Sequence, residues 1–225
     1  MLHPMQLYCC LIVGVLIIKS DNTPTLPPNT IQIPLKSTDS GLVQSQNYYT
    51  KMQQPRSYTI HGASSTFVKV PGLTIPFYHT EPLLYKIRLE GKAYSSHSRG
   101  VWMFARLMID DYLLYVNKLV PNTADRYKYD NQCGALDCFE YRGGFYWYAT
   151  SPTWTTVVFN DIIYLTPGLH VFDVGVRGGP DYNPSIGMYP IYIHTWVLTM
   201  EVIQFDRQAN IGMTPVNVSM NSSDG

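Results

Sequence analysis

Residues 84–94 read LYKIRLEGKAY. Tyr85, Ile87 and Leu89 alternate with charged side chains, and this period of two predicts a β-strand with one face in a core and the other in solvent. Further segments between glycine, proline and polar breakers also have strand-like patterns. They are residues 57–61, 66–70, 101–109, 112–116, 145–149, 153–159, 161–165, 169–177 and 191–205. Their spacing predicts two packed antiparallel sheets, that is, a β-sandwich of the jelly-roll type.

The composition supports an all-β chain. The 225 residues include 18 Tyr, 16 Gly and 16 Pro. Aromatic and β-branched residues suit pleated sheets, while glycine and proline divide the chain into short pieces. A hydrophobic content of 45% excludes disorder of the whole chain. The formal net charge of +0 argues against a nucleic-acid binder, because such proteins carry a surplus of basic residues.

The amino-terminal segment has the pattern of an export signal. Residues 7–18 read LYCCLIVGVLII, about a dozen apolar residues, whereas a transmembrane helix needs roughly 20. The polar sequence that follows predicts cleavage after Ser20, so residues 1–20 are expected to be a signal peptide and the mature protein to be secreted and extracellular. A buried strand or a short anchor is the alternative. No later segment is apolar enough to predict a stable membrane span.

The remaining chain divides into three regions by composition. Residues 21–56 are polar and proline-rich, and they are expected to form an extended leader with a short edge strand at 31–33. Residues 57–205 are expected to form the β-sandwich domain, in which the long polar stretch 117–142 is expected to lie on the surface. Residues 206–225 form a polar tail with N-glycosylation acceptor motifs at Asn217 and Asn221.

Cys133 and Cys138 are predicted to form a disulfide bond, because an exported chain meets an oxidising environment. The closed loop is short, so the bond would fix a loop more than it would stabilise the whole fold. A metal-binding cysteine pair is the alternative. The mature chain offers no second cysteine pair and no nearby histidine to complete such a site.

Oxygen-bearing side chains gather in the same loop and suggest calcium, which prefers six to eight oxygen ligands from flexible loops. The candidate ligands are Asp125, Asp130, Asp137 and Glu140. A solvated polar loop with Asx turns is the alternative interpretation, and no other cofactor is predicted.

The run Tyr141–Tyr148, YRGGFYWY, is the most distinctive stretch. Tyrosine, tryptophan and arginine are enriched at binding surfaces, and aromatic faces also stack on sugars. The candidate binding residues are Tyr127, Tyr129, Arg142, Tyr146 and Tyr148. The alternative is that alternate rings of one strand fill the core, and both can hold at once because the two faces of a strand differ.

The closing part of the sequence resembles the C1q/TNF-like jelly-roll ectodomains. The resemblance is carried by YLTPGLHVFDVGVR at residues 164–177 and HTWVLTMEVIQF at residues 194–205. In that family a strand, a Pro-Gly turn, a His- or Tyr-bearing strand and a final strand follow in this order. The resemblance covers about the last third of the chain. It implies a homotrimer of β-sandwiches that binds a partner outside the cell.

The sequence contains no recognisable catalytic motif, such as G-x-S-x-G or a P-loop. We therefore expect a secreted, non-enzymatic β-sandwich that binds an extracellular protein or glycan. A self-assembling matrix or structural component is one alternative. A secreted hydrolase is another, and it would depend on Glu90 and Glu201 as paired carboxylates.

Overall fold

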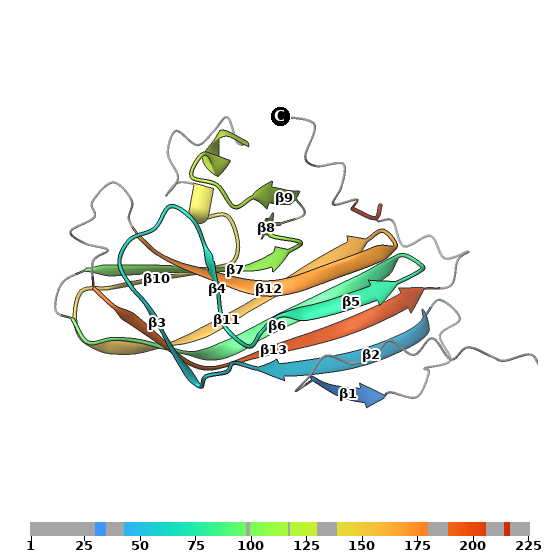
Figure 1. Cartoon of the computed structure of the whole chain (residues 1–225), viewed down its shortest axis with the longest axis horizontal. Helices are drawn as coiled ribbons and strands as arrows, with labels where there is room; N and C mark the ends of the chain where they lie inside the picture. Colours follow the sequence, from blue (N-terminus) through green and yellow to red (C-terminus); the bar gives the residue numbers. More distant parts are fainter. Residues whose placement is uncertain are drawn as a thin grey trace, which may run out of the picture.

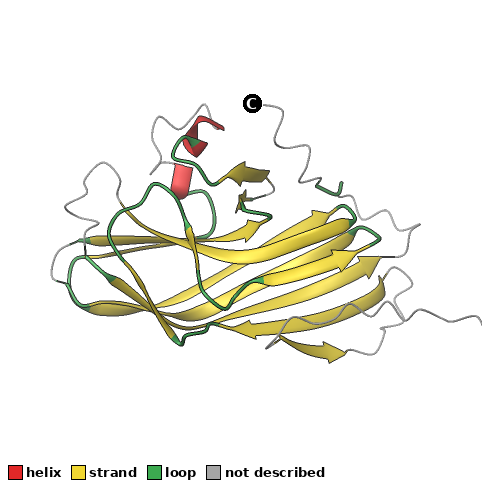
Figure 2. Ribbon diagram, in the orientation of Figure 1, coloured by secondary structure: helices red, strands yellow, loops and turns green. Residues whose placement is uncertain are grey.

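The computed structural model describes residues 30–34, 43–97, 100–116, 118–129, 139–179, 189–205 and 214–216. Strands make up most of this part of the chain (Figure 2). The elements are β1 (Thr30–Pro34), β2 (Val43–Met52), β3 (Ser57–Ile60), β4 (Val68–Lys69), β5 (Ile75–His79), β6 (Leu83–Ser95), β7 (Val101–Ile109), β8 (Tyr112–Tyr115), β9 (Lys118–Pro121), the 3₁₀ helix η1 (Arg126–Tyr129), β10 (Phe145–Ala149), β11 (Thr153–Leu165), β12 (Gly168–Gly179) and β13 (Ile191–Phe205). The all-β prediction is confirmed.

The strands form two antiparallel sheets (Figure 1). The first sheet has the order β1-β2-β13-β6-β11, and β3 also pairs with β13. In the second sheet β5 pairs with β12, β12 with β7, and β7 with β10; β4, β8 and β9 extend it. The eight principal strands are β2, β5, β6, β7, β10, β11, β12 and β13. If these strands are numbered one to eight in chain order, strands one, eight, three and six form one sheet. Strands two, seven, four and five form the other. This is the connectivity of a jelly roll.

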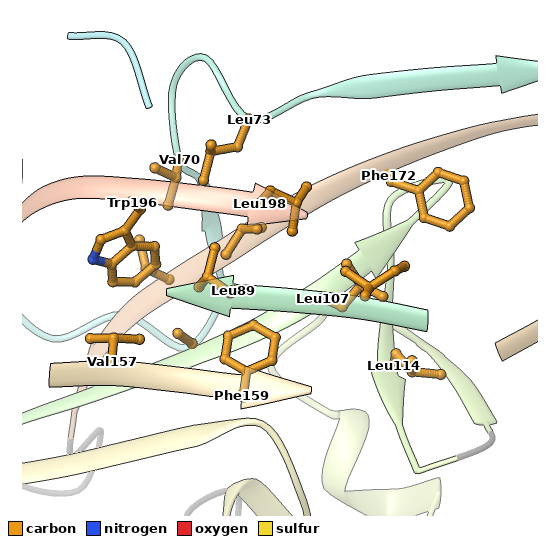
Figure 3. Packing of buried hydrophobic residues seen from close by; sticks show 14 of the residues in the cluster. Val70, Leu73, Leu89, Leu107, Leu114, Val157, Phe159, Phe172, Trp196 and Leu198 are labelled. Carbon is orange, nitrogen blue, oxygen red and sulfur yellow. The ribbon is translucent and has the colours of Figure 1, made fainter. Parts of the chain in front are cut away.

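The main core lies between the sheets and follows the alternation seen in the sequence. In β6, Tyr85, Ile87 and Leu89 are buried, whereas the charged residues between them are exposed. The inward sets predicted for β12 and β13 are also confirmed. They are Phe172, Val174, Val176, Trp196, Leu198, Met200 and Val202. Figure 3 shows Leu89, Phe172, Trp196 and Leu198 within this core.

Three predictions about the elements need correction. Residues 43–52 of the expected leader form β2, so the sandwich begins before residue 57. The predicted strands at 153–159 and 161–165 are one strand, β11, because its pairing with β6 continues through Asn160 and Asp161. The stretch 117–142 is not only a surface loop, because it contains β9 and the buried residues Arg126 and Glu140.

A smaller second core covers the outer face of the second sheet. Alternate side chains of β7 point away from the main core. These outward side chains are apolar or positively charged, whereas a solvent-facing sheet surface usually carries polar side chains. The segments that follow β7 fold back over them. The apolar members of this second core are Phe67, Phe104, Met108, Leu113, Tyr115, Val120 and Phe139.

Trp196 occupies a bulge in β13, where the pairing with β6 shifts register between His194 and Val197. Thr195 takes a φ of 51°, and Trp196 is completely buried. The indole N–H donates to the Lys92 carbonyl at 3.0 Å. A Cβ atom at Gly91 would lie 2.1 Å from Cδ1 of this indole, so the ring needs a glycine beneath it.

Candidate functional site

Strand β10 separates its aromatic side chains between two faces. Phe145 and Trp147 pack against the main core, whereas Tyr146 and Tyr148 lie on the outer face and are 38% and 46% exposed. Tyr141, in the turn before the strand, is 52% exposed. The structure therefore combines both interpretations of the aromatic run, because one face fills the core and the other face meets solvent.

The exposed rings form a continuous group with Trp102 of β7, and we call this group the aromatic surface: Trp102, Tyr141, Tyr146 and Tyr148. The Trp102 ring contacts Tyr146 and Tyr148 edge to face, with centroids 6.0 and 5.5 Å apart. Tyr141 and Tyr146 meet in the same manner at 5.0 Å. Edge-to-face packing of this kind fixes rings in place, so the surface is preorganised.

A buried cluster of charges lies next to the aromatic surface. Glu140 is 1% exposed, and its carboxylate accepts from Arg106 Nε at 3.1 Å and Arg126 Nε at 2.7 Å. The Tyr115 hydroxyl donates to the same carboxylate at 3.0 Å. Both oxygens of Glu140 thus face cations or a hydroxyl, as a buried carboxylate requires.

Arg177 of β12 completes the cluster. Its Nε lies 3.6 Å from Glu140, and its Nη1 donates to the Ser64 carbonyl at 2.8 Å. The guanidinium also lies over the Phe104 ring, 4.4 Å from the centroid. Arg106 stacks over Tyr115 at 3.6 Å, and burial raises the pKa of the Tyr115 phenol, which therefore stays neutral.

The charge cluster supports the turn that carries the tyrosines. Arg106 Nη2 donates to the Glu140 carbonyl at 2.7 Å, and Nη1 donates to the Arg142 carbonyl at 2.9 Å. Gly143 and Gly144 follow with φ of 78° and 67°, a region that suits glycine. At Gly144 a Cβ would lie 2.6 Å from the Ala105 carbonyl oxygen. The turn is thus held against β7, and with it the positions of Tyr141 and Tyr146.

The predicted binding residues fall into two groups. Arg142, Tyr146 and Tyr148 lie on the turn and strand just described, and all three are exposed. Tyr127 and Tyr129 lie on η1, where Tyr127 packs against the second core and Tyr129 is 49% exposed.

The structure does not support Glu140 as a calcium ligand, because arginines and Tyr115 occupy its oxygens. Asp125 is exposed and pairs with Lys128 at 3.1 Å. Within the described residues, no group of three or more His, Cys, Asp or Glu side chains could hold a metal ion. The other predicted positions lie outside the described residues. They are Asp130, Asp137, Cys133, Cys138, Asn217 and Asn221, together with residues 1–20.

Glu90 and Glu201 do not form a catalytic pair. Both lie on the outer face of the first sheet, where Glu90 aligns with Val197 of β13. Glu201 lies four residues beyond Val197 on β13. Four residues along a strand correspond to about 13 Å, which exceeds the roughly 5–10 Å between glycosidase carboxylates. Each already has a cation, because Glu90 pairs with Arg88 and Glu201 with Lys86.

Sequence analysis missed the three arginines of the charge cluster. A signal for one of them exists, because Arg106 interrupts the otherwise apolar strand VWMFARLMI. An arginine in a strand that is apolar on both faces must find a buried partner. The sequence does not indicate which of the acidic residues that partner is.

The fold and the site define a jelly-roll β-sandwich with a preorganised aromatic surface. No protein-family model matches this chain, and no curated protein matches its sequence. Within the described residues, no helix has the length and apolar character needed to cross a membrane.

Comparison with solved structures gives matches of low similarity. One is that of the infectious bursal disease virus Gx strain, with a TM-score of 0.29 and 11% identity over 77% of this chain and 46% of that chain. Another is Eiger TNF from S. frugiperda, with a TM-score of 0.26 and 8% identity over 70% of this chain and 97% of that chain. A third is a CocE/NonD family hydrolase from Staphylococcus aureus, with a TM-score of 0.24 and 9% identity over 79% of this chain and 36% of that chain. This chain spans less than half the length of the viral chain. Matches at this level carry no argument about family or function.

Proposed function

We propose that this chain is a secreted, non-enzymatic binding module, and that its aromatic surface binds an extracellular protein or glycan. The observation that carries the proposal is the exposure of Tyr141, Tyr146 and Tyr148 on a rigid support. Rigid tyrosines offer large contact area at a small entropic cost, which is why they dominate many binding surfaces. The export signal expected at residues 1–20 supports an extracellular partner.

Replacing Tyr146 and Tyr148 together with alanine is expected to weaken binding at least tenfold, about 1.4 kcal/mol, because two rings of the aromatic surface are removed. The secreted protein would be tested on a glycan microarray and on a display library of extracellular domains. Tyr78→Ala is the matched control, because Tyr78 is 60% exposed on β5 and lies outside the aromatic surface. Equal binding by the wild type and the double variant would contradict the proposal, as would a wild type that binds nothing in either panel.

Self-assembly is the second candidate function, and the outer face of the first sheet favours it. An antiparallel sheet that meets water normally presents polar side chains there. Beside the charged side chains of β6, this face also exposes large apolar residues. They are Met52, Trp154, Val158 and Ile162, which are 49%, 56%, 41% and 53% exposed. Three of them follow one another along the outward face of β11, an arrangement found at contact surfaces, and the resemblance to C1q/TNF-like ectodomains implies a homotrimer.

The molar mass of the secreted chain tests this second candidate. Light scattering is expected to give a trimer for the wild type and a monomer for the variant Val158→Lys/Ile162→Lys, because two charges would enter the contact. The exposed position of both residues means that the monomer should stay folded, which circular dichroism checks. A wild type that is monomeric at every concentration would exclude self-assembly.

A further inference from the structure

Two buried histidines lie side by side where β5 pairs with β12. His79 ends β5 and is 7% exposed, and His170 in β12 is 5% exposed. Their ring centroids are 5.2 Å apart. Histidine changes charge near neutral pH, so a buried pair at this distance makes the local structure depend on protonation.

His170 has an oxygen atom within hydrogen-bond distance of each ring nitrogen. Its Nδ1 lies 2.8 Å from the Asp110 carboxylate, and its Nε2 lies 3.0 Å from the Thr166 carbonyl oxygen. Both partners are hydrogen-bond acceptors. Asp110 also accepts the Val171 N–H at 2.7 Å. His170 and Asp110 therefore join β12 to the turn between β7 and β8 and to the turn before β12.

His79 is placed for its neutral form. Its Nδ1 donates to the Glu81 carbonyl at 2.6 Å, and its Nε2 is buried without a hydrogen-bond partner among the described residues. Desolvation lowers the pKa of His79, the hydrogen bond to Glu81 raises it, and the charge of His170 lowers it, with a net decrease from 6.5. A second proton would therefore place a positive charge on a buried nitrogen that has no acceptor among the described residues.

Titratable groups from other elements and from its own turn surround His79. Its ring contacts His170 of β12 and Tyr85 of β6, Asp110 lies against His170, and Glu81 lies two residues further along the chain. The Tyr85 hydroxyl is itself buried, and burial raises its pKa, so it remains neutral. Asp111, next to Asp110, already pairs with Lys69, which also pairs with Asp173.

We propose that His79, His170 and Asp110 form an acid-sensitive clasp, which holds β5 to β12 at neutral pH and loosens this end of the sandwich in acid. The direction of the pH effect follows from the proton affinity of His79 in the open and in the closed state. In the open state His79 has its ordinary proton affinity and takes up a proton near pH 6.5, whereas in the closed state it resists the proton. Each pH unit below about 6.5 therefore raises the open population up to tenfold, until the closed state also becomes protonated.

Hydrogen exchange on the full chain tests the clasp. After correction for intrinsic exchange rates, amides of residues 75, 77–79 and 168–172 are expected to open up to about 30-fold more at pH 5.0 than at pH 6.5. His79→Gln cannot gain the charge, so this increase should disappear. His61→Gln is the matched control, because His61 is exposed, and it should behave as the wild type.

Two results would overturn the proposal. One is an equal increase in opening for His79→Gln and the wild type. The other needs no variant: an NMR titration of the folded wild type in which the His79 ring is already protonated at pH 6.5. The NMR titration tests the clasp even if His79→Gln fails to fold. Neither depends on whether the aromatic surface binds a partner.

Discussion

Replacement of Glu140 with alanine is expected to lower the free energy of unfolding by about 3–5 kcal/mol. The reason is that the side chain is the buried carboxylate shared by Arg106, Arg126 and Arg177. Without it, these guanidinium groups stay buried among Phe67, Phe104 and Tyr115, with backbone carbonyls and the Tyr115 hydroxyl as acceptors. Domains of ordinary stability have only about 5–15 kcal/mol in total, so the loss is a large fraction.

Urea denaturation measures this loss without the charge screening that guanidinium chloride introduces. Glu90→Ala is the control, because the Glu90–Arg88 pair is exposed and should contribute less than about 1 kcal/mol. Glu140→Gln keeps the shape and removes the charge, so it should fall between alanine and the wild type. If Glu140→Ala unfolds within 1 kcal/mol of the wild type, the cluster does not hold the second core as described.

Replacement of Trp196 with alanine is expected to cost about 3–5 kcal/mol, because it empties the largest fully buried side-chain site of the main core. The loss includes the hydrogen bond from the indole to the Lys92 carbonyl. Gln53 contacts the same bulge, because its N–H donates to the Trp196 carbonyl at 2.8 Å and its side chain accepts from the Trp196 N–H at 3.1 Å. Thermal or urea unfolding measures the change.

A double-mutant cycle with Gly91 separates the packing of this ring from other effects. Gly91→Ala alone should destabilise by several kcal/mol, because its Cβ would overlap the indole. In the Trp196→Ala background most of that cost should vanish, which gives a strong coupling between the two positions. Additive effects would show that the indole does not rest on Gly91.

Much of the fold could be predicted from local pattern. The bounds of β7, β10 and β13 agree with the sequence, because each strand has a sustained apolar pattern between clear breakers. Strand β2 was missed because only Tyr49 is fully buried in it, so it shows no alternation. Strand β5 was missed because Pro76 interrupts the pattern; this proline is tolerated on an exposed position of a short strand.

Only the exposed residues of the candidate site could be predicted from the sequence. Tyr146 and Tyr148 could be found because they alternate with inward residues on one strand. The charge cluster could not, because Arg106, Arg126 and Glu140 are joined across 14 and 34 residues of chain. Such partners are selected by the way in which loops fold back over a sheet, and single-sequence periodicity carries no information about that.

The position of β13 between β2 and β6 has a consequence for biosynthesis. Tyr49 near the start of the sandwich aligns with Met200 near its end, so the first sheet closes only when almost the whole chain has been made. Contacts at such separation form slowly, because a long loop must be ordered first. Strands β7, β8 and β9 are consecutive hairpins and can pair early. Until β13 has been made, the edges of β2 and β6 that pair with it stay unpaired. During this interval the nascent chain is most exposed to wrong pairing with other chains.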